Sequence, residues 1–131
     1  MPITSHDLYT VLAPVASGQS LMTYGGLSQA YLRLTGQAYP PHLSWDQPLG
    51  DLNKQLDARG WPPLSAVVVL QDSAGGFGEP GGGFWESCPS IPRAPTSPTQ
   101  RTSLWLDFLR KVYAAPWPAT IPTTPPPRKG S

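Results

Sequence analysis

The hydrophobic positions near the N-terminus repeat with the period of a helix. In residues 5–16 they recur at i, i+3, i+4 and i+7, the spacing of one buried helical face. These positions are Leu8, Val11, Leu12 and Val15. Ser5 is the expected N-cap, because its hydroxyl can accept a hydrogen bond from a free backbone N–H group. Pro14 lacks an N–H group, so we expect the helix to end or kink near Ala13.

A second helix is predicted over residues 20–36, where apolar side chains again recur at helical spacing. Its apolar positions are Leu27, Tyr31 and Leu34. Thr23 is the expected N-cap, and Gly36 the expected stop, since glycine readily adopts the left-handed conformation that ends many helices. Residues 37–43 contain two adjacent prolines, which prevent the helix from continuing.

The third predicted helix spans residues 44–60. It begins at Ser44, or later with Pro48 in its first turn, and Gly60 ends it. Its apolar stripe consists of Leu49, Leu52 and Leu56. The polar residues assigned to its outer face are Asp51, Asn53, Lys54 and Asp57. We therefore expect a helix with one buried and one solvated face.

One segment has the pattern of a buried strand. Residues 66–70 are an unbroken apolar run rich in valine, which is typical of a strand covered on both faces. The glycine-rich residues 73–83 follow, and residues 81–85 are expected to return as an antiparallel strand. The pattern predicts a β-hairpin over residues 64–85.

Proline shapes the C-terminal third of the chain. Residues 87–99 carry four prolines and are interpreted as a linker or as an arm that lies on the surface. Residues 100–114 predict a last helix, in which Leu104, Phe108 and Val112 share one face. Residues 116–131 carry six prolines and are expected to form a flexible, extended tail.

The predicted element order is three helices, a β-hairpin and a C-terminal helix. This order is typical of an α+β domain of the winged helix-turn-helix type, here over residues 1–115. In such domains the third helix can enter the major groove of DNA, and the hairpin can contact the backbone or the minor groove.

Composition supports one compact core with proline-rich flanks. The 131 residues include 18 Pro and 13 Gly, nearly a quarter of the chain. The sequence also has 39% hydrophobic residues and five Trp, which is too apolar for a fully disordered chain. The prolines concentrate in residues 37–43, 87–99 and 116–131, outside the predicted helices and strands.

Charge and cysteine content narrow the function classes. Nine Lys and Arg residues against eight Asp and Glu give a formal net charge of +1, without the basic excess of a dedicated nucleic-acid binder. The single cysteine, Cys88, excludes an internal disulfide and a thiolate zinc cluster. The N-terminus lacks the pattern of a secretory signal, and no apolar run is long enough for a membrane span. We expect a cytoplasmic protein without a membrane partner.

Short motifs in residues 20–85 resemble a known family. They are Thr23-Tyr24-Gly25-x-Leu27, Leu49-Gly50 and Pro62-Pro63-Leu64. This pattern resembles the DNA-binding lobe of alkylguanine-DNA alkyltransferases and alkyltransferase-like proteins. The run Ala66-Val67-Val68-Val69 stands where that family has its catalytic Pro-Cys-His-Arg motif. The resemblance therefore implies DNA binding without alkyl transfer.

Six residues are the candidates for nucleic-acid contacts. The third helix offers side chains able to contact base edges or phosphates, although Asp51 and Asp57 flank them and would repel a duplex. A solvated helix face explains the same pattern equally well. The candidates are Tyr24, Arg33, Asn53, Lys54, Gln55 and Arg59.

The sequence offers little support for catalysis or for a metal or cofactor. His6 and His42 are too few to form a metal site with Cys88 unless acidic ligands join them. The glycine-rich loop lacks the Gly-Lys-Ser/Thr ending of a phosphate-binding loop. A hydrolase reading would rest on Asp7, Asp46, Asp51 and His42, which form no known motif. We therefore expect a non-enzymatic protein without cofactor.

Two functions remain open from the sequence. The first is DNA binding through the helix at 44–60 and the hairpin at 64–85. The alternative is a protein-interaction adaptor that uses the proline-rich arms. In that case Trp117, within Pro116-Trp117-Pro118, is the side chain expected to be exposed, as part of a docking peptide or of an arm that packs on the domain.

Overall fold

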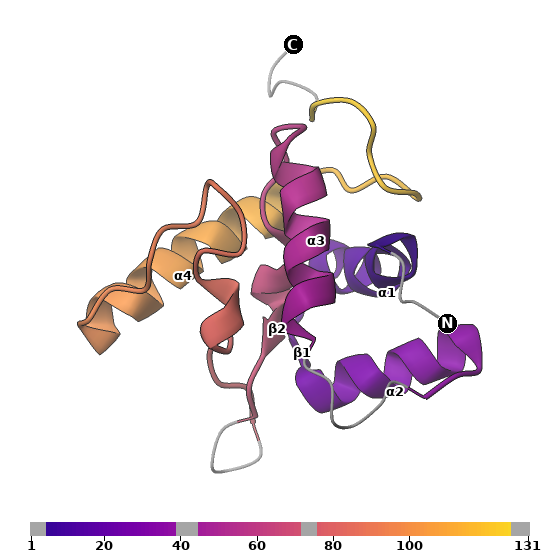
Figure 1. The fold of residues 1–131 in the computed structure, drawn as a ribbon, viewed down its shortest axis with the longest axis horizontal. Coiled ribbons are helices and arrows are strands. Elements are labelled where there is room, and N and C mark those ends of the chain that lie inside the picture. Colours follow the sequence, from indigo (N-terminus) through magenta and orange to yellow (C-terminus); the bar gives the residue numbers. More distant parts are fainter. Residues whose placement is uncertain (1–4, 39–44, 72–75, 127–131) are drawn as a thin grey trace.

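A computed structural model describes residues 5–38, 45–71 and 76–126 (Figure 1). In this part of the chain the fold is α+β, as the sequence predicts, with four α-helices and a two-stranded parallel sheet. The helices are α1 (Ser5–Ser17), α2 (Tyr24–Thr35), α3 (Asp46–Asp57) and α4 (Pro98–Ala114). The strands are β1 (Met22–Thr23) and β2 (Val68–Val69).

The ends of α2 confirm the predicted cap and stop. The Thr23 hydroxyl accepts a hydrogen bond from the Gly26 N–H group at 3.0 Å. Gly36 has a φ of 75°, and its N–H group donates to the Leu32 carbonyl at 2.8 Å. The predicted Ser44 cap of α3 lies outside the described residues, and Trp45 stands at the N-cap of that helix.

Pro14 does not end α1, so the helix does not stop near Ala13, one of the two predicted outcomes. The helix continues through it to Ser17, and the Pro14 carbonyl accepts a hydrogen bond from the Gly18 N–H group at 3.0 Å. The Pro14 ring faces solvent, whereas Ala13 and Ala16 on either side are buried in the core. Packing of these neighbours holds the helical backbone despite the hydrogen bond that proline cannot donate.

The predicted hairpin over residues 64–85 is wrong in its strand pairing. Leu64–Val67 forms a 3₁₀ turn, and β2 pairs in parallel with β1, Met22 opposite Val68. The expected return strand is instead the 3₁₀ turn Gly82–Phe84. Among the described residues, antiparallel contacts lie next to the turn, not between residues 66–69 and 81–85. Gln71 forms a bridge with Phe77, the Leu70 N–H group donates to the Glu79 carbonyl at 2.8 Å, and the Leu70 carbonyl accepts from the Gly78 N–H group at 2.7 Å. The long separation between β1 and β2 in the sequence hid this pairing from the local pattern.

The segment from Leu64 to Val69 forms the centre of the core. All six of its residues are buried, and α1, α3 and α4 pack against its 3₁₀ turn. The Trp105 indole of α4 donates to the Ala66 carbonyl at 2.9 Å, which satisfies a buried acceptor that has no strand partner. Burial on all sides explains the apolar run without a regular sheet.

The two proline-rich segments in the C-terminal third pack on the domain, as far as the described residues extend. In residues 87–99 the side chains of Cys88 and Ile91 are buried, so this segment is an arm that lies against the core. Residues 116–126, the described part of the predicted tail, run back along the domain past the end of α3 (Figure 1). Trp117 is half-buried, contrary to the expectation that it is exposed.

Candidate functional site

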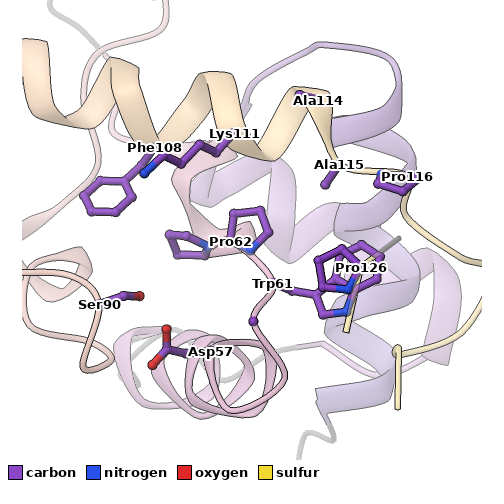
Figure 2. A pocket seen from close by; sticks show the side chains of 12 residues that line it. Asp57, Trp61, Pro62, Ser90, Phe108, Lys111, Ala114, Ala115, Pro116 and Pro126 are labelled. Carbon is purple, nitrogen blue, oxygen red and sulfur yellow. The ribbon is translucent and has the colours of Figure 1, made fainter. Parts of the chain in front are cut away.

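An open groove of about 490 Å³ lies between the end of α3 and the C-terminal half of α4 (Figure 2). Its lining is mainly apolar, and prolines from three separate parts of the chain contribute to it. The apolar lining residues with the largest rings are Trp61, Pro62, Pro63, Phe108, Pro116 and Pro126. Clefts of this size and character are typical of ligand and peptide sites.

The turn after α3 places Trp61 in this groove. Gly60 has a φ of 79°, a left-handed conformation that costs glycine little and that reverses the chain at the end of the helix. The Trp61 N–H group then donates to the Leu56 carbonyl at 2.9 Å. Because Pro62 and Pro63 follow directly, the backbone leaves the helix in an extended path.

The chain's own proline-rich tail, residues 116–126, packs against the Trp61 side chain. The Trp61 indole donates to the Thr124 carbonyl at 2.7 Å. The Trp61 and Trp117 ring centroids are 5.1 Å apart. Pro126 follows in the same segment and lies beside Trp61 at one end of the groove (Figure 2).

Two further contacts fix the start of this tail. The Trp117 indole donates to the Val112 carbonyl at 2.7 Å, and the Tyr9 hydroxyl donates to the Pro118 carbonyl. Burial raises the pKa of Tyr9 to about 12. Trp61 and Tyr9 therefore form an aromatic surface that binds a non-helical, proline-rich segment through their indole and phenol donors.

Opposite charges stand on the two sides of the groove. Asp57 of α3 and Lys111 of α4 both line it, and Figure 2 shows them on opposite walls. The Lys111 ammonium lies 5.7 Å from the centroid of the Phe108 ring, within the range of a cation–π contact. The groove thus combines an apolar floor with one anionic and one cationic side.

Asn53 does not point outward, contrary to the prediction. Its side chain is fully buried, and its amide donates to the hydroxyls of Ser65 at 2.7 Å and Ser87 at 2.9 Å. Its carbonyl oxygen accepts from the Ser65 backbone N–H group at 3.3 Å. Asn53 therefore joins α3 to the central segment and to the proline-rich arm, where it cannot reach a nucleic acid.

Two other nucleic-acid candidates have partners within the domain. The Tyr24 hydroxyl accepts from the Gly81 N–H group at 3.1 Å, and burial is the main reason that the pKa of Tyr24 is raised. The exposed Gln55 amide donates to the Ser5 hydroxyl at 2.7 Å. Both side chains tie segments of the domain together.

The three basic candidates are exposed but are not gathered on one helix. Lys54 lies on α3, Arg59 follows the end of that helix, and Arg33 lies near the end of α2. Figure 1 shows α2 crosswise to α3, with their C-terminal ends well apart. The exposed Asp51 also lies on α3, so the charge of that face is mixed.

The buried Cys88 thiol lies 3.5 Å from the Ser90 hydroxyl. Among the described residues, no group of three or more His, Cys, Asp and Glu side chains is placed to share a metal ion, and His42 lies outside them. The same part of the chain contains no helix with both the length and the apolar character needed to cross a membrane.

The groove was not predicted from the sequence. Its walls come from residues within 57–63 and 108–116, together with Ser90 and Pro126, which are far apart along the chain. The one local signal is Trp61-Pro62-Pro63, a bulky aromatic residue next to two prolines just after a helix. That signal predicts a rigid apolar turn. It does not predict which residues lie opposite the turn.

Comparisons with known proteins gave no match, whether with family models, with curated proteins or with solved structures. The resemblance to the alkyltransferase lobe therefore stays a prediction.

Proposed function

We propose that this chain is a non-enzymatic protein-interaction module, an adaptor whose groove beside Trp61 receives a segment of a partner protein. The observation that carries the proposal is the open apolar groove of about 490 Å³ next to an aromatic surface that already holds a peptide segment. A pocket lined by rings and prolines changes little in shape on binding, which lowers the entropic cost of association.

The charges beside the groove support the same function. Asp57 and Lys111 can each pair with an opposite charge on a bound segment, which favours one direction of the ligand over the other. Nearly neutral overall charge suits a protein partner better than a polyanion.

A variant that fills the groove tests this proposal. Ala114 is exposed on the last turn of α4 and lines the groove, so Ala114→Trp should obstruct it without disturbing the core. Ser103, exposed on the same helix and away from the groove, gives the matched control Ser103→Trp. Labelled full-length chain is applied to an array of 12-residue peptides of varied composition.

We expect a subset of the peptides to bind, with that binding lost in Ala114→Trp and retained in Ser103→Trp. Absence of binding to every peptide, or equal loss in both variants, would reject the groove as an interaction site. Circular dichroism of both variants shows whether the helices are intact.

DNA binding by a winged-helix arrangement is the second candidate. It is supported by the exposure of Lys54 and Arg59 at α3, the helix that would enter the major groove. A mobility-shift assay with a mixed-sequence duplex at low salt tests it. A shift that weakens when Lys54 and Arg59 are replaced by Ala would support DNA binding, and no shift at low salt would exclude it.

A further inference from the structure

We infer that the partner segment received by the groove is proline-rich and carries a basic residue that pairs with Asp57. This inference rests on the proposed function and specifies its ligand. It follows from the way in which the chain binds its own tail, and from the placement of charge around the groove.

The tail shows which kind of backbone this surface accepts. Thr124 and Pro126 lie on Trp61, with the Thr124 carbonyl bonded to the indole and Pro126 forming part of the groove lining. Aromatic-lined grooves recognise extended, proline-rich segments. The bond from the Trp61 indole to a backbone carbonyl in such a segment fits that mode of recognition. Such segments lose little entropy on binding because they are already extended in solution.

The lining of the groove continues this surface beyond Pro126. Apart from the charged Asp57 and Lys111, that lining consists of rings and short side chains, including Pro62, Phe108 and Pro116. Proline has no N–H group, so a proline-rich segment buries few unpaired donors against such an apolar lining. A single β-strand of ordinary composition would leave backbone N–H groups unpaired against the same apolar lining.

Asp57 gives the groove its charge preference. It is partly buried at the end of α3, where the helix dipole does not favour a negative side chain. The Lys111 ammonium on the opposite wall is directed over the Phe108 ring. A basic ligand residue therefore finds an anionic partner on the α3 side, and an acidic residue is disfavoured there.

The test uses the full-length chain and synthetic, end-capped peptides. The probe is a fluorescent 10-residue peptide of Pro and Thr with one Arg. Comparison peptides replace Arg with Glu, or every Pro with Ala. Asp57→Asn removes the charge, and Asp51→Asn, on the exposed face of the same helix and outside the groove, is the matched control. Anisotropy gives the dissociation constants.

We expect the Arg peptide to bind most tightly and the Ala-substituted peptide to bind at least tenfold more weakly. Asp57→Asn should weaken the Arg peptide about threefold to fivefold, as for a partly exposed ion pair, and Asp51→Asn should leave it unchanged. Equal affinity of the Arg and Glu peptides, or of the Pro and Ala peptides, would overturn the inference.

The two proposals fail in different ways. If peptides without proline bind, and Ala114→Trp abolishes that binding, the groove is an interaction site and only the proline-rich ligand is wrong. If no peptide binds the wild-type chain, both proposals are rejected.

Discussion

Gly83 is a position where a side chain fits only if the Asp46 carboxylate moves. A Cβ atom there would overlap the carboxylate of Asp46, whereas a Cβ atom at the neighbouring Gly82 would meet nothing within 4 Å. Because the exposed Asp46 side chain must leave its place, we expect Gly83→Ala to lower the free energy of unfolding by about 0.5–1.5 kcal/mol. Gly82→Ala should change it by less than about 0.5 kcal/mol. Urea denaturation of the two variants measures the difference, and equal midpoints would show that Asp46 moves aside without cost.

Asn53 is a buried polar residue whose hydrogen bonds connect α3 to the central segment and to the proline-rich arm. Asn53→Ala removes its contacts to Ser65 and Ser87 and leaves the buried Ser65 N–H group unpaired. We expect a loss of about 2–3 kcal/mol in the free energy of unfolding. Gln55→Ala, which removes one exposed hydrogen bond from the same helix, should cost less than about 0.5 kcal/mol. Similar losses in both variants would contradict this account.

At the scale of elements, the tail behaves as part of the domain. The Trp117 ring packs against Trp61, with its indole bonded to Val112. Because Trp117 is only half-buried, we expect Trp117→Ala to cost about 2 kcal/mol, less than a fully buried aromatic residue. The exposed Thr120 supplies the control Thr120→Ala. Denaturation midpoints, together with faster proteolysis within residues 116–126 of the Trp117 variant, check the prediction.

The central segment illustrates how far local patterns predict elements. Residues 64–69 are all buried, as the apolar run indicates. Only Val68–Val69 is a strand, because its partner β1 has just two residues. The Trp105 indole pairs with the Ala66 carbonyl, which is not part of a strand ladder. Hydrophobicity thus predicted burial, while the hydrogen-bond partners decided the backbone conformation.

For the whole molecule, buried tyrosines make stability sensitive to alkaline pH. The pKa of Tyr9 is raised by burial from 10 to about 12, and burial also raises the pKa of Tyr113. Above pH 10 the unfolded chain releases the Tyr9 proton while the folded chain retains it. The Tyr9 contribution to the free energy of unfolding is therefore fully present below about pH 10 and is lost between pH 10 and 12.

Tyr9→Phe isolates this contribution. At pH 7 the variant loses the hydrogen bond to the Pro118 carbonyl, which should cost about 1 kcal/mol. Above pH 10 its stability should fall less steeply than that of the wild type, because residue 9 no longer titrates. Urea denaturation at pH 7, 9, 10.5 and 11.5 measures both effects. If the free energy of unfolding fell equally steeply with pH in the variant and the wild type, Tyr9 would not be the cause of the loss of stability at alkaline pH.

The sequence by itself determined the features that depend on near neighbours in the chain. Thr23 and Gly36 predicted both ends of α2, since a cap and a left-handed stop involve only residues within one turn. The apolar spacing predicted four helices, and composition predicted a single compact core. The prolines correctly predicted which segments are neither helix nor strand. They did not predict whether those segments pack on the domain.

Only the tertiary structure decided which distant residues meet. The parallel pairing of β1 with β2, the inward orientation of Asn53 and the seating of the tail on Trp61 all join segments far apart in sequence. The groove has the same origin, because its walls come from the end of α3, the end of α4 and the tail. Such contacts form when the chain buries its apolar surface as a whole, so no local pattern specifies them.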